Sequence, residues 1–393
     1  MSNEGENLLQ VARESGINIP GLCYHRKLTP TGACRLCVVK IEGQRGLIMS
    51  CTVKVTEGLI VTAFDNELQE ARRHTIDYLL AEHNDDNDGT YHDELRILAV
   101  EYDLLDQSNR KVPNIFRSIG YKADESSHVL TYDASKCIKC FRCIKGCEEV
   151  QGKNVLSFSE RGIHSHIIAG FDNWLESECD GCGECIQLCP TGALVEKPNR
   201  EIIRLDKIDK KVITTCPYCG VGCQIELLIQ NGNIVRSNGV EGVLPNDGRL
   251  CVKGRFGYDY VHDKERLTKP LLKKNGVFSE ISWDEALSII ASRFLEIKEE
   301  FGKEALAGYS SAKCTNEENY LFQKFVRIAF GNNNIDYCTR LCHASTVTAM
   351  LLSIGDGAGS NSIQDFELTD CLFVTGNNII DTHPVTATYV KAG

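Results

Sequence analysis

Apolar residues recur at helical spacing along residues 66–100, which predicts helical structure with one buried face. The positions that form this face are Leu68, Ala71, Ile76, Leu79 and Leu80. Two capping patterns predict further helices in the last third of the chain. Ser282-Trp283-Asp284-Glu285 opens a helix with the apolar stripe Ala286, Ile289, Ile290, Phe294 and Ile297. Thr315-Asn316-Glu317-Glu318 opens a second helix, which we expect to end near Phe330, before Gly331.

Strand patterns occur in two places. Gln224–Ile229 and Ile234–Arg236 flank the turn dipeptide Asn231-Gly232 and predict a β-hairpin. The charged segment NREIIRLDKIDKKV before it is expected to be a link. Beyond Asp263 the pattern becomes α/β, and CLFVTGNN at Cys371–Asn378 predicts a buried strand that runs into Gly-Asn. Such an edge of an open α/β sheet presents backbone to phosphate-bearing ligands.

Composition narrows the class of protein. A chain of 393 residues can form two to four domains. Its net charge of −11 argues against nucleic acid or an anionic membrane as the main partner. No apolar run approaches the ~20 residues of a membrane span, and the N-terminus shows no signal peptide. The 20 cysteines fall in tight groups, which without an export signal indicates metal ligation in the cytoplasm rather than disulfides.

Eight cysteines form two copies of Cys-x2-Cys-x2-Cys-x3-Cys. They are Cys137, Cys140, Cys143 and Cys147, then Cys179, Cys182, Cys185 and Cys189. This spacing is that of two cubane [4Fe–4S] clusters, in which the fourth cysteine of each run binds the other cluster. Structural zinc, which favours paired Cys-x2-Cys knuckles, and disulfides are the alternatives.

Two more cysteine groups flank this pair of motifs. Cys23, Cys34, Cys37 and Cys51 suit a [2Fe–2S] centre, with the small residues Gly21, Gly32 and Ala33 beside the sulfurs. Cys216, Cys219, Cys223 and Cys251 suit a third [4Fe–4S] cluster, because the last cysteine has no close partner for a zinc knuckle. The remaining cysteines, Cys314, Cys338, Cys342 and Cys371, are by default small buried hydrophobes.

The central motifs resemble bacterial two-cluster ferredoxins, and the first group resembles the N-terminal domain of the complex I large subunit, iron-only hydrogenases and related formate dehydrogenases. The Cys216 group resembles the N-terminal domain of molybdenum or tungsten bis-pterin oxidoreductases. Taken in order, these segments look like the N-terminal part of the catalytic subunit of a cytoplasmic, NAD- or ferredoxin-linked formate dehydrogenase.

The chain departs from that family near both ends. It begins almost at the helix Leu8–Ser15, where the resembling domains first have a β-hairpin, so the N-terminal strands are expected to be missing. His83 stands near the histidine of a further cluster, but no cysteine accompanies it, and we expect a surface histidine there. Asp85, Asp86 and Asp88 are expected to be solvated. The resembling subunits are longer, so this sequence is expected to be a fragment.

The resemblance also implies site residues. Lys253 would lie between cluster and pterin, and Gly376, Asn377 and His383 would line the pterin nucleotide. In Arg340-Leu341-Cys342-His343, the Cys342 thiolate would coordinate Mo or W. Arg340 would bind the formate carboxylate and His343 would take or relay the proton.

We therefore predict a multidomain fold with α+β and α/β parts. The expected domains are a [2Fe–2S] ferredoxin-like domain at 1–65, a helical linker without its usual cluster at 66–130, a two-[4Fe–4S] bacterial ferredoxin domain at 131–200, a [4Fe–4S] molybdopterin-oxidoreductase domain at 209–265 and an incomplete α/β molybdopterin-binding domain at 266–393.

The implied function is oxidation of formate to CO2, or the reverse, with electrons passed along the iron–sulfur chain. The implied cofactors are one [2Fe–2S] cluster, three [4Fe–4S] clusters and, in the full-length parent, Mo- or W-bis(molybdopterin guanine dinucleotide). Expected partners are a flavin-containing NADH-dehydrogenase-type subunit, ferredoxin or hydrogenase subunits. The alternatives are an electron-transfer module without a working pterin site, or a complex I large-subunit-like component of NADH dehydrogenase.

Overall fold

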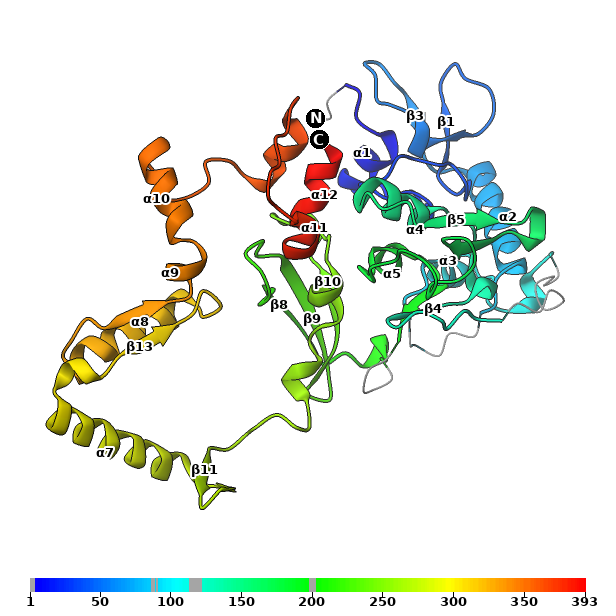
Figure 1. Ribbon diagram of the computed structural model, residues 1–393. Helices are drawn as coiled ribbons and strands as arrows, with labels where there is room; N and C mark the ends of the chain where they lie inside the picture. The colour runs from blue at the N-terminus through cyan, green and yellow to red at the C-terminus, as the bar shows by residue number, and fades with distance from the viewer. Residues whose placement is uncertain (1–3, 86–88, 90, 113–121, 198–202) are drawn as a thin grey trace. The chain divides into compact units, whose positions relative to one another are not determined.

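The computed structural model describes residues 4–85, 89, 91–112, 122–197 and 203–393. The chain divides into two compact units, which are described separately (Figure 1). The first unit contains Met1–Cys216, Gly220–Asp259 and Phe366–Gly393, and the second contains Pro217–Cys219 and Tyr260–Asp365. Across the described residues, no helix is both long and apolar enough to cross a membrane.

The first unit begins with helix α1 (Leu8–Glu14) and a three-stranded antiparallel sheet. The strands β1 (Val38–Ile41), β2 (Ile48–Met49) and β3 (Val61–Thr62) have the order β2-β1-β3. Asn7 caps α1, because its side chain accepts hydrogen bonds from the amides of Leu9 and Gln10. The buried Leu9, Val39 and Ile41 join helix and sheet in one apolar core.

The next segment contains two helices rather than one continuous helical stretch. Helices α2 (Asn66–Ala81) and α3 (Glu94–Glu101) each begin at an aspartate N-cap, Asp65 and Asp93. Asp93 interrupts the pattern because its carboxylate accepts the amide of Arg96 and starts a new helix. Asp85 forms an ion pair with Arg96, whereas Asp86 and Asp88 lie outside the described residues.

The central cysteine motifs lie in a two-fold repeated arrangement of short helices and strands. Strand β4 (Leu130–Tyr132) pairs with β7 (Leu194–Glu196), and β5 (Leu156–Ser159) pairs with β6 (His166–Ala169). Helix α4 (Arg142–Lys145) continues as a π-helical turn, Gly146–Val150, and α5 (Glu184–Leu188) follows the second motif. At Gly146 a Cβ would overlap Leu188, so the missing side chain allows the two helical segments to pack closely.

The predicted hairpin at 224–236 is present and gains a third strand. Strands β9 (Gln224–Gln230) and β10 (Asn233–Gly239) are joined at Asn231 and Gly232, both with positive φ. The expected link ends earlier than predicted, since β8 (Lys210–Thr215) pairs with β9 along its whole length (Figure 1). Helix α6 (Val252–Phe256) follows this sheet.

The last residues of the chain also belong to the first unit. Helix α12 (Pro384–Ala392) follows the short helix α11 (Ile379–Thr382). The Tyr389 hydroxyl donates to the Pro245 carbonyl at 2.9 Å and accepts from Arg249 at 2.7 Å. The predicted buried strand at Cys371–Asn378 is wrong: this segment forms no strand and Phe373 is exposed. An apolar run becomes a strand only where a neighbouring strand completes its hydrogen bonds.

The second unit has α/β character, as predicted. It begins with the hairpin of β11 (Leu271–Lys274) and β12 (Val277–Glu280), followed by helix α7 (Trp283–Phe301). The strands β13 (Gly308–Ser310) and β14 (Ile335–Tyr337) are parallel, and helix α8 (Asn316–Phe325) lies between them in the sequence. Helices α9 (Thr339–Cys342) and α10 (Ala344–Ser353) complete it. The capping residues are confirmed at both helices, and a π-helical turn, Val326–Phe330, ends at Gly331. Of the predicted α7 stripe, Ala286 is buried, whereas Ile289 and Ile290 are exposed.

Candidate metal centres

The first cysteine group lies in two neighbouring apolar cores of the first unit. Cys37 and Cys51 pack with α1 and the N-terminal sheet, whereas Cys23 and Cys34 pack with α2 and α3. Cys23, Cys34, Cys37 and Cys51 are all buried. Hydrogen bonds from Cys34 and then Cys51 hold the pKa of Cys23 far below its ordinary value, and a hydrogen bond from Cys51 lowers the pKa of Cys37 to about 7. Cys23 therefore lies within hydrogen-bond reach of Cys34 and Cys51, and Cys51 lies within reach of Cys37. The Leu22 amide also donates to the Cys34 sulfur at 3.4 Å, an interaction that stabilises a thiolate ligand.

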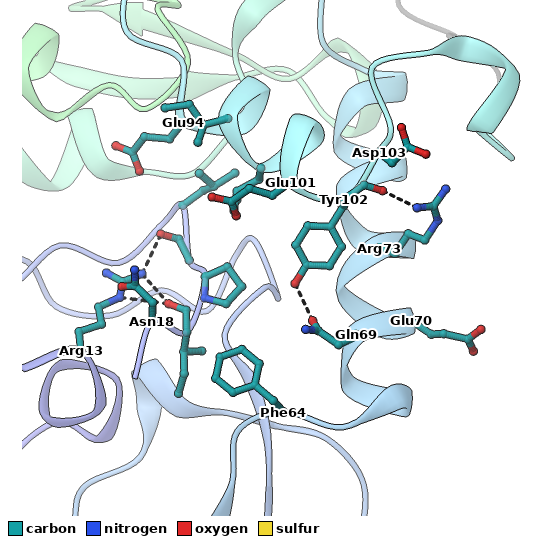
Figure 2. Close-up of a pocket in the computed structure, with 16 residues that line it drawn as sticks. Arg13, Asn18, Phe64, Gln69, Glu70, Arg73, Glu94, Glu101, Tyr102 and Asp103 are labelled. Carbon is teal, nitrogen blue, oxygen red and sulfur yellow. Dashed lines mark hydrogen bonds between the residues drawn. The ribbon is translucent and has the colours of Figure 1, made fainter. Parts of the chain in front are cut away.

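A cavity of about 850 Å³ lies beside this group. Its lining includes Gly21 and Leu22, which directly precede Cys23. Figure 2 shows Arg13 on one side and Arg73 on the other. Both guanidinium groups donate to backbone carbonyls, Arg13 to Ile19 and Arg73 to Tyr102.

The two central motifs fold their backbone in the same way. Lys139 and Phe141 have φ of 56° and 68°, and the equivalent positions of the second motif, Gly181 and Gly183, have φ of 68° and 71°. These left-handed residues wrap the chain so that amides point toward the cysteines. The Lys139 amide donates to the Cys137 sulfur at 3.4 Å. Amide donors around grouped sulfurs fit an anionic iron–sulfur cluster.

The structure gathers the eight cysteines of these motifs into two sets across the repeat. The first set is Cys137, Cys140, Cys143 and Cys189, and the second set is Cys147, Cys179, Cys182 and Cys185. Burial raises the pKa of Cys143 well above its ordinary value, and the charges of Cys140, Cys137 and Cys189, and last that of Cys185 from the other set, add to that rise. Burial raises the pKa of Cys185 likewise, with Cys182, Cys179 and Cys147 adding to it. Ligand exchange between the motifs would use this grouping, and the assignment of the ligands stays a prediction.

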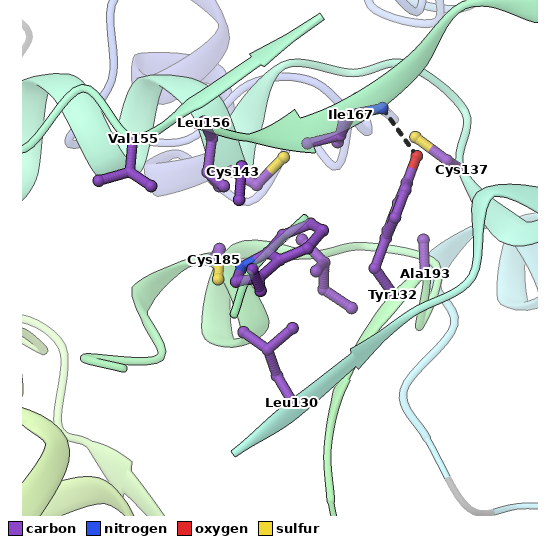
Figure 3. Close-up of a cluster of buried hydrophobic side chains, with 12 residues drawn as sticks. Leu130, Tyr132, Cys137, Cys143, Val155, Leu156, Ile167, Cys185 and Ala193 are labelled. Atoms are coloured by element: carbon purple, nitrogen blue, oxygen red, sulfur yellow. Dashed lines mark hydrogen bonds between the residues drawn. The ribbon is translucent and has the colours of Figure 1, made fainter. Parts of the chain in front are cut away.

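Burial makes the charged thiolate form of these cysteines unfavourable. Burial raises the pKa of Cys137 and of Cys182 to about 11. Several thiolates packed together in an apolar core become favourable when iron neutralises them. Figure 3 shows Cys137, Cys143 and Cys185 among the buried side chains of Leu130 and Tyr132. No three His, Cys, Asp or Glu side chains in the described part of the chain could hold a single metal ion, but a cluster is bound at several irons rather than at one point.

Three cysteines of the next group come together at one end of the β8–β9–β10 sheet. Cys216 follows β8 and Cys223 precedes β9, and the Cys216 amide donates to the Cys223 carbonyl at 2.8 Å. Cys251 is the N-cap of α6, and a Cβ at Gly254 would lie 3.6 Å from the Cys216 sulfur. Cys219 belongs to the second unit. Lys253 lies on α6 and is exposed.

Arg340, Cys342 and His343 lie at helix α9 in the second unit, and all three are exposed. The Arg340 guanidinium donates to the Asp336 carboxylate at 2.7 Å, and this hydrogen bond raises the pKa of Arg340. Asp336 was not among the predicted site residues, although its i,i+4 spacing from Arg340 indicates an ion pair on one face of a helix.

The predicted pterin residues Gly376, Asn377 and His383 lie in the first unit, where all three are exposed. His383 Nε2 lies 3.8 Å from the position of a Cβ at Gly220, within the loop of the Cys216 group. The structure thus places His383 beside an iron–sulfur loop, which the sequence pattern alone did not indicate.

Two default assignments are wrong. Cys314, Cys338, Cys342 and Cys371 are exposed rather than buried. His83 is buried rather than at the surface: its Nε2 lies 3.1 Å from Asp93 and its Nδ1 lies 3.1 Å from the Lys136 carbonyl. In the sequence, Asp93 is the residue that could have indicated the burial of His83, because it caps α3 and also offers the histidine a hydrogen-bond partner.

Four family models match the chain. They are "2Fe-2S iron-sulfur cluster binding domain" at residues 1–65, "NADH-quinone oxidoreductase subunit 3, ferredoxin-like domain" at 127–195, "Molybdopterin oxidoreductase Fe4S4 domain" at 209–263 and "Molybdopterin oxidoreductase" at 266–392. They confirm the predicted fold class and the predicted resemblance to molybdopterin oxidoreductases with iron–sulfur domains.

Individual proteins are similar over nearly the whole chain. "Probable oxidoreductase YjgC" of Bacillus subtilis (strain 168) is 32% identical over 99% of this chain and 43% of its own length. "Putative formate dehydrogenase SAB2186c" of Staphylococcus aureus (strain bovine RF122 / ET3-1) is 29% identical over 98% of this chain and 43% of its own length. The chain thus spans less than half the length of these relatives. The crystal structure of an NAD+-reducing [NiFe]-hydrogenase in the H2-reduced state matches 50% of this chain and 83% of its own, with 27% identity and a TM-score of 0.44.

Proposed function

Because the chain joins two iron–sulfur domains to the Fe4S4 and molybdopterin domains of the molybdopterin oxidoreductases, we propose that it is part of the catalytic subunit of a formate dehydrogenase. The reaction is HCOO⁻ to CO2, with release of one proton and two electrons, or its reverse. The observation that carries this proposal is Arg340-Leu341-Cys342-His343 inside the molybdopterin domain, after four groups of cluster-type cysteines.

Each residue of this segment has a role that its chemistry suits. When bound, a Mo or W bis-pterin centre supplies a two-electron acceptor. The Cys342 thiolate is a soft ligand for that metal, and its exposed position leaves the sulfur accessible. The Arg340 guanidinium binds a carboxylate, and Asp336 now holds it in the way that formate would. His343 would accept the proton. By the family resemblance, Lys253, Gly376, Asn377 and His383 would help to hold the pterin.

Contacts within the first unit support one order for the electron path. Arg255 lies on α6, whose N-cap is Cys251, and donates to the carbonyl of Cys182 at 2.8 Å. At the other end of the ferredoxin domain, Cys140 packs in one apolar core with Cys23 and Cys34. Electrons therefore pass from the Cys216 group to the set that contains Cys182, then to the set that contains Cys140, and finally to the [2Fe–2S] group.

The cavity beside the [2Fe–2S] group is the exit that we assign to the electron acceptor. Glu70 and Glu101 line it and are exposed, so the cavity carries two negative charges at its surface. Phe64 adds an exposed apolar surface. A flavin-containing NADH-dehydrogenase-type subunit, a ferredoxin or a hydrogenase subunit would dock there.

A second candidate is an iron–sulfur electron-transfer module without a working pterin site. It is favoured by the assignment of Arg340, Cys342 and His343 to the second unit, whereas Lys253, Gly376, Asn377 and His383, two complete cluster-type cysteine sets and the first group belong to the first unit. A complex I-like component is the third reading, supported by the family match at residues 127–195.

The test is formate-dependent reduction of a viologen dye by anaerobically purified protein. Cys342→Ser should lower the rate roughly 100-fold or more, because loss of a metal ligand costs several kcal/mol of transition-state stabilisation. Cys338→Ser is the matched control, since Cys338 is exposed and lies one helical turn earlier. A Cys342→Ser protein that keeps the full rate would refute the assignment. A wild-type protein with its clusters but no formate activity would favour the electron-transfer module.

A further inference from the structure

Arg255 is a buried cation between two of the cluster sites. It lies four residues after Cys251, and only 2% of it is exposed. Its Nε donates to the Cys182 carbonyl at 2.8 Å, and its Nη1 donates to Gln187 at 2.8 Å. A Cβ at Gly183 would overlap the arginine, so the absence of a side chain at Gly183 makes room for it. Arg255 thereby fixes helix α6 against the loop that carries Cys182.

The carboxylate nearest to Arg255, that of Glu184, is shared with a second cation, Lys27. Glu184 is 1% exposed, and its Oε2 lies 3.8 Å from Arg255 Nη2, beyond hydrogen-bond distance. Its Oε1 lies 3.2 Å from the buried Lys27 of the N-terminal domain. The Arg255 Nη2 has no hydrogen-bond partner among the described residues. The positive charge of Arg255 is therefore only partly neutralised.

Such a charge acts strongly on what lies beside it. In a buried site the effective dielectric constant is low, so nearby charges interact more strongly than in water. Reduction adds one electron to a cluster, so a neighbouring cation favours the reduced state and a neighbouring anion disfavours it.

We propose that Arg255 is a positioning residue for electron transfer, which clamps the helix of the Cys216 group to the Cys182 loop and raises the reduction potential of the cluster bound by Cys147, Cys179, Cys182 and Cys185. Glu184 has the opposite effect on the same cluster. The proposal rests on the iron–sulfur assignment alone and does not depend on formate being the substrate.

Redox titration of the anaerobically purified chain, monitored by electron paramagnetic resonance, tests the proposal. Cys182→Ser first identifies the signal of the relevant cluster. Arg255→Gln should shift the midpoint potential of that signal downward, and Glu184→Gln should shift it upward. The double variant should lie between them, and Arg255→Lys should lie nearer the wild type. Signals of the [2Fe–2S] centre and of the cluster bound by Cys137, Cys140, Cys143 and Cys189 should stay in place.

Opposite signs separate charge from loosened packing, because a merely structural defect would not reverse between two neighbouring substitutions. Arg110→Gln is the control for loss of a buried ion pair, since Arg110 pairs with Asp77 of α2. Iron content and melting temperature verify that each variant is folded. If the Arg255→Gln protein does not assemble its clusters, the shift of the midpoint potential in Glu184→Gln tests the proposal by itself. Unchanged potentials in fully loaded variants, or shifts of the same sign, would overturn the proposal.

Discussion

Substitution of Gly192 tests how the helical segment 66–112 packs against the ferredoxin domain. Gly192 has φ +66°, and a Cβ there would overlap the ring of Tyr91. That ring is 7% exposed and lies under the Lys136 ammonium, 4.4 Å from the ring centroid, so it has little room to retreat. Gly162 is the matched control, because its φ is +61° and nothing lies within 4 Å of a Cβ.

Gly192→Ala and Gly162→Ala are expected to lower the free energy of unfolding by different amounts. A left-handed backbone at a non-glycine residue costs about 1 kcal/mol in both variants. Overpacking against Tyr91 adds about 1–3 kcal/mol in Gly192→Ala only. In a unit of this size, roughly 2 kcal/mol of extra destabilisation lowers the melting temperature by roughly 4–8 °C.

The assay is anaerobic thermal unfolding followed by circular dichroism, with iron content measured beforehand. Gly192→Ala should melt several degrees below Gly162→Ala. Equal melting temperatures for the two variants would show that Tyr91 does not pack on Gly192. They would thereby contradict the packing of the segment around Tyr91 against the ferredoxin domain.

Two other predictions concern ligand exchange and pH. Cys147→Ala should remove the same cluster signal as Cys182→Ala, although Cys147 belongs to the other sequence motif; loss of the signal that Cys140→Ala removes would contradict the grouping. Glu241 has a pKa of about 2: burial would raise it, but a hydrogen bond from His25 and the charge of Lys27 outweigh burial. A depressed pKa contributes stability that is complete above the ordinary value of 4.5 and disappears as the pH falls toward 2. The difference in melting temperature between wild type and Glu241→Gln should therefore shrink from pH 5 to pH 3, and a constant difference would exclude this ion pair as its cause.

Local signals in the sequence predicted local structure well. The cysteine spacings, the capping residues Ser282 and Thr315, and the turn at Asn231-Gly232 each act within a few residues, and the structure contains the corresponding loops, helix starts and hairpin. Their physical causes are hydrogen bonds and backbone conformations that depend on near neighbours.

Structural features that depend on residues far apart in the sequence could not be predicted from local sequence patterns. His83 is buried because Lys136, 53 residues away, offers a carbonyl to its ring. Arg255 reaches Cys182 across 73 residues, and no spacing rule links them. Phe373 is exposed because the run around it finds no pairing strand among the described residues. Apolar character alone does not say which segment will cover it.

Elemental analysis of the anaerobically purified chain for Fe, Mo and W, together with a pterin fluorescence assay, tests the central claim most directly. We predict about 14 iron atoms per chain, with one Mo or W and pterin where the candidate site binds its cofactor. Zinc in place of iron, or an iron content near four, would contradict the assignment of the four cysteine groups to iron–sulfur clusters.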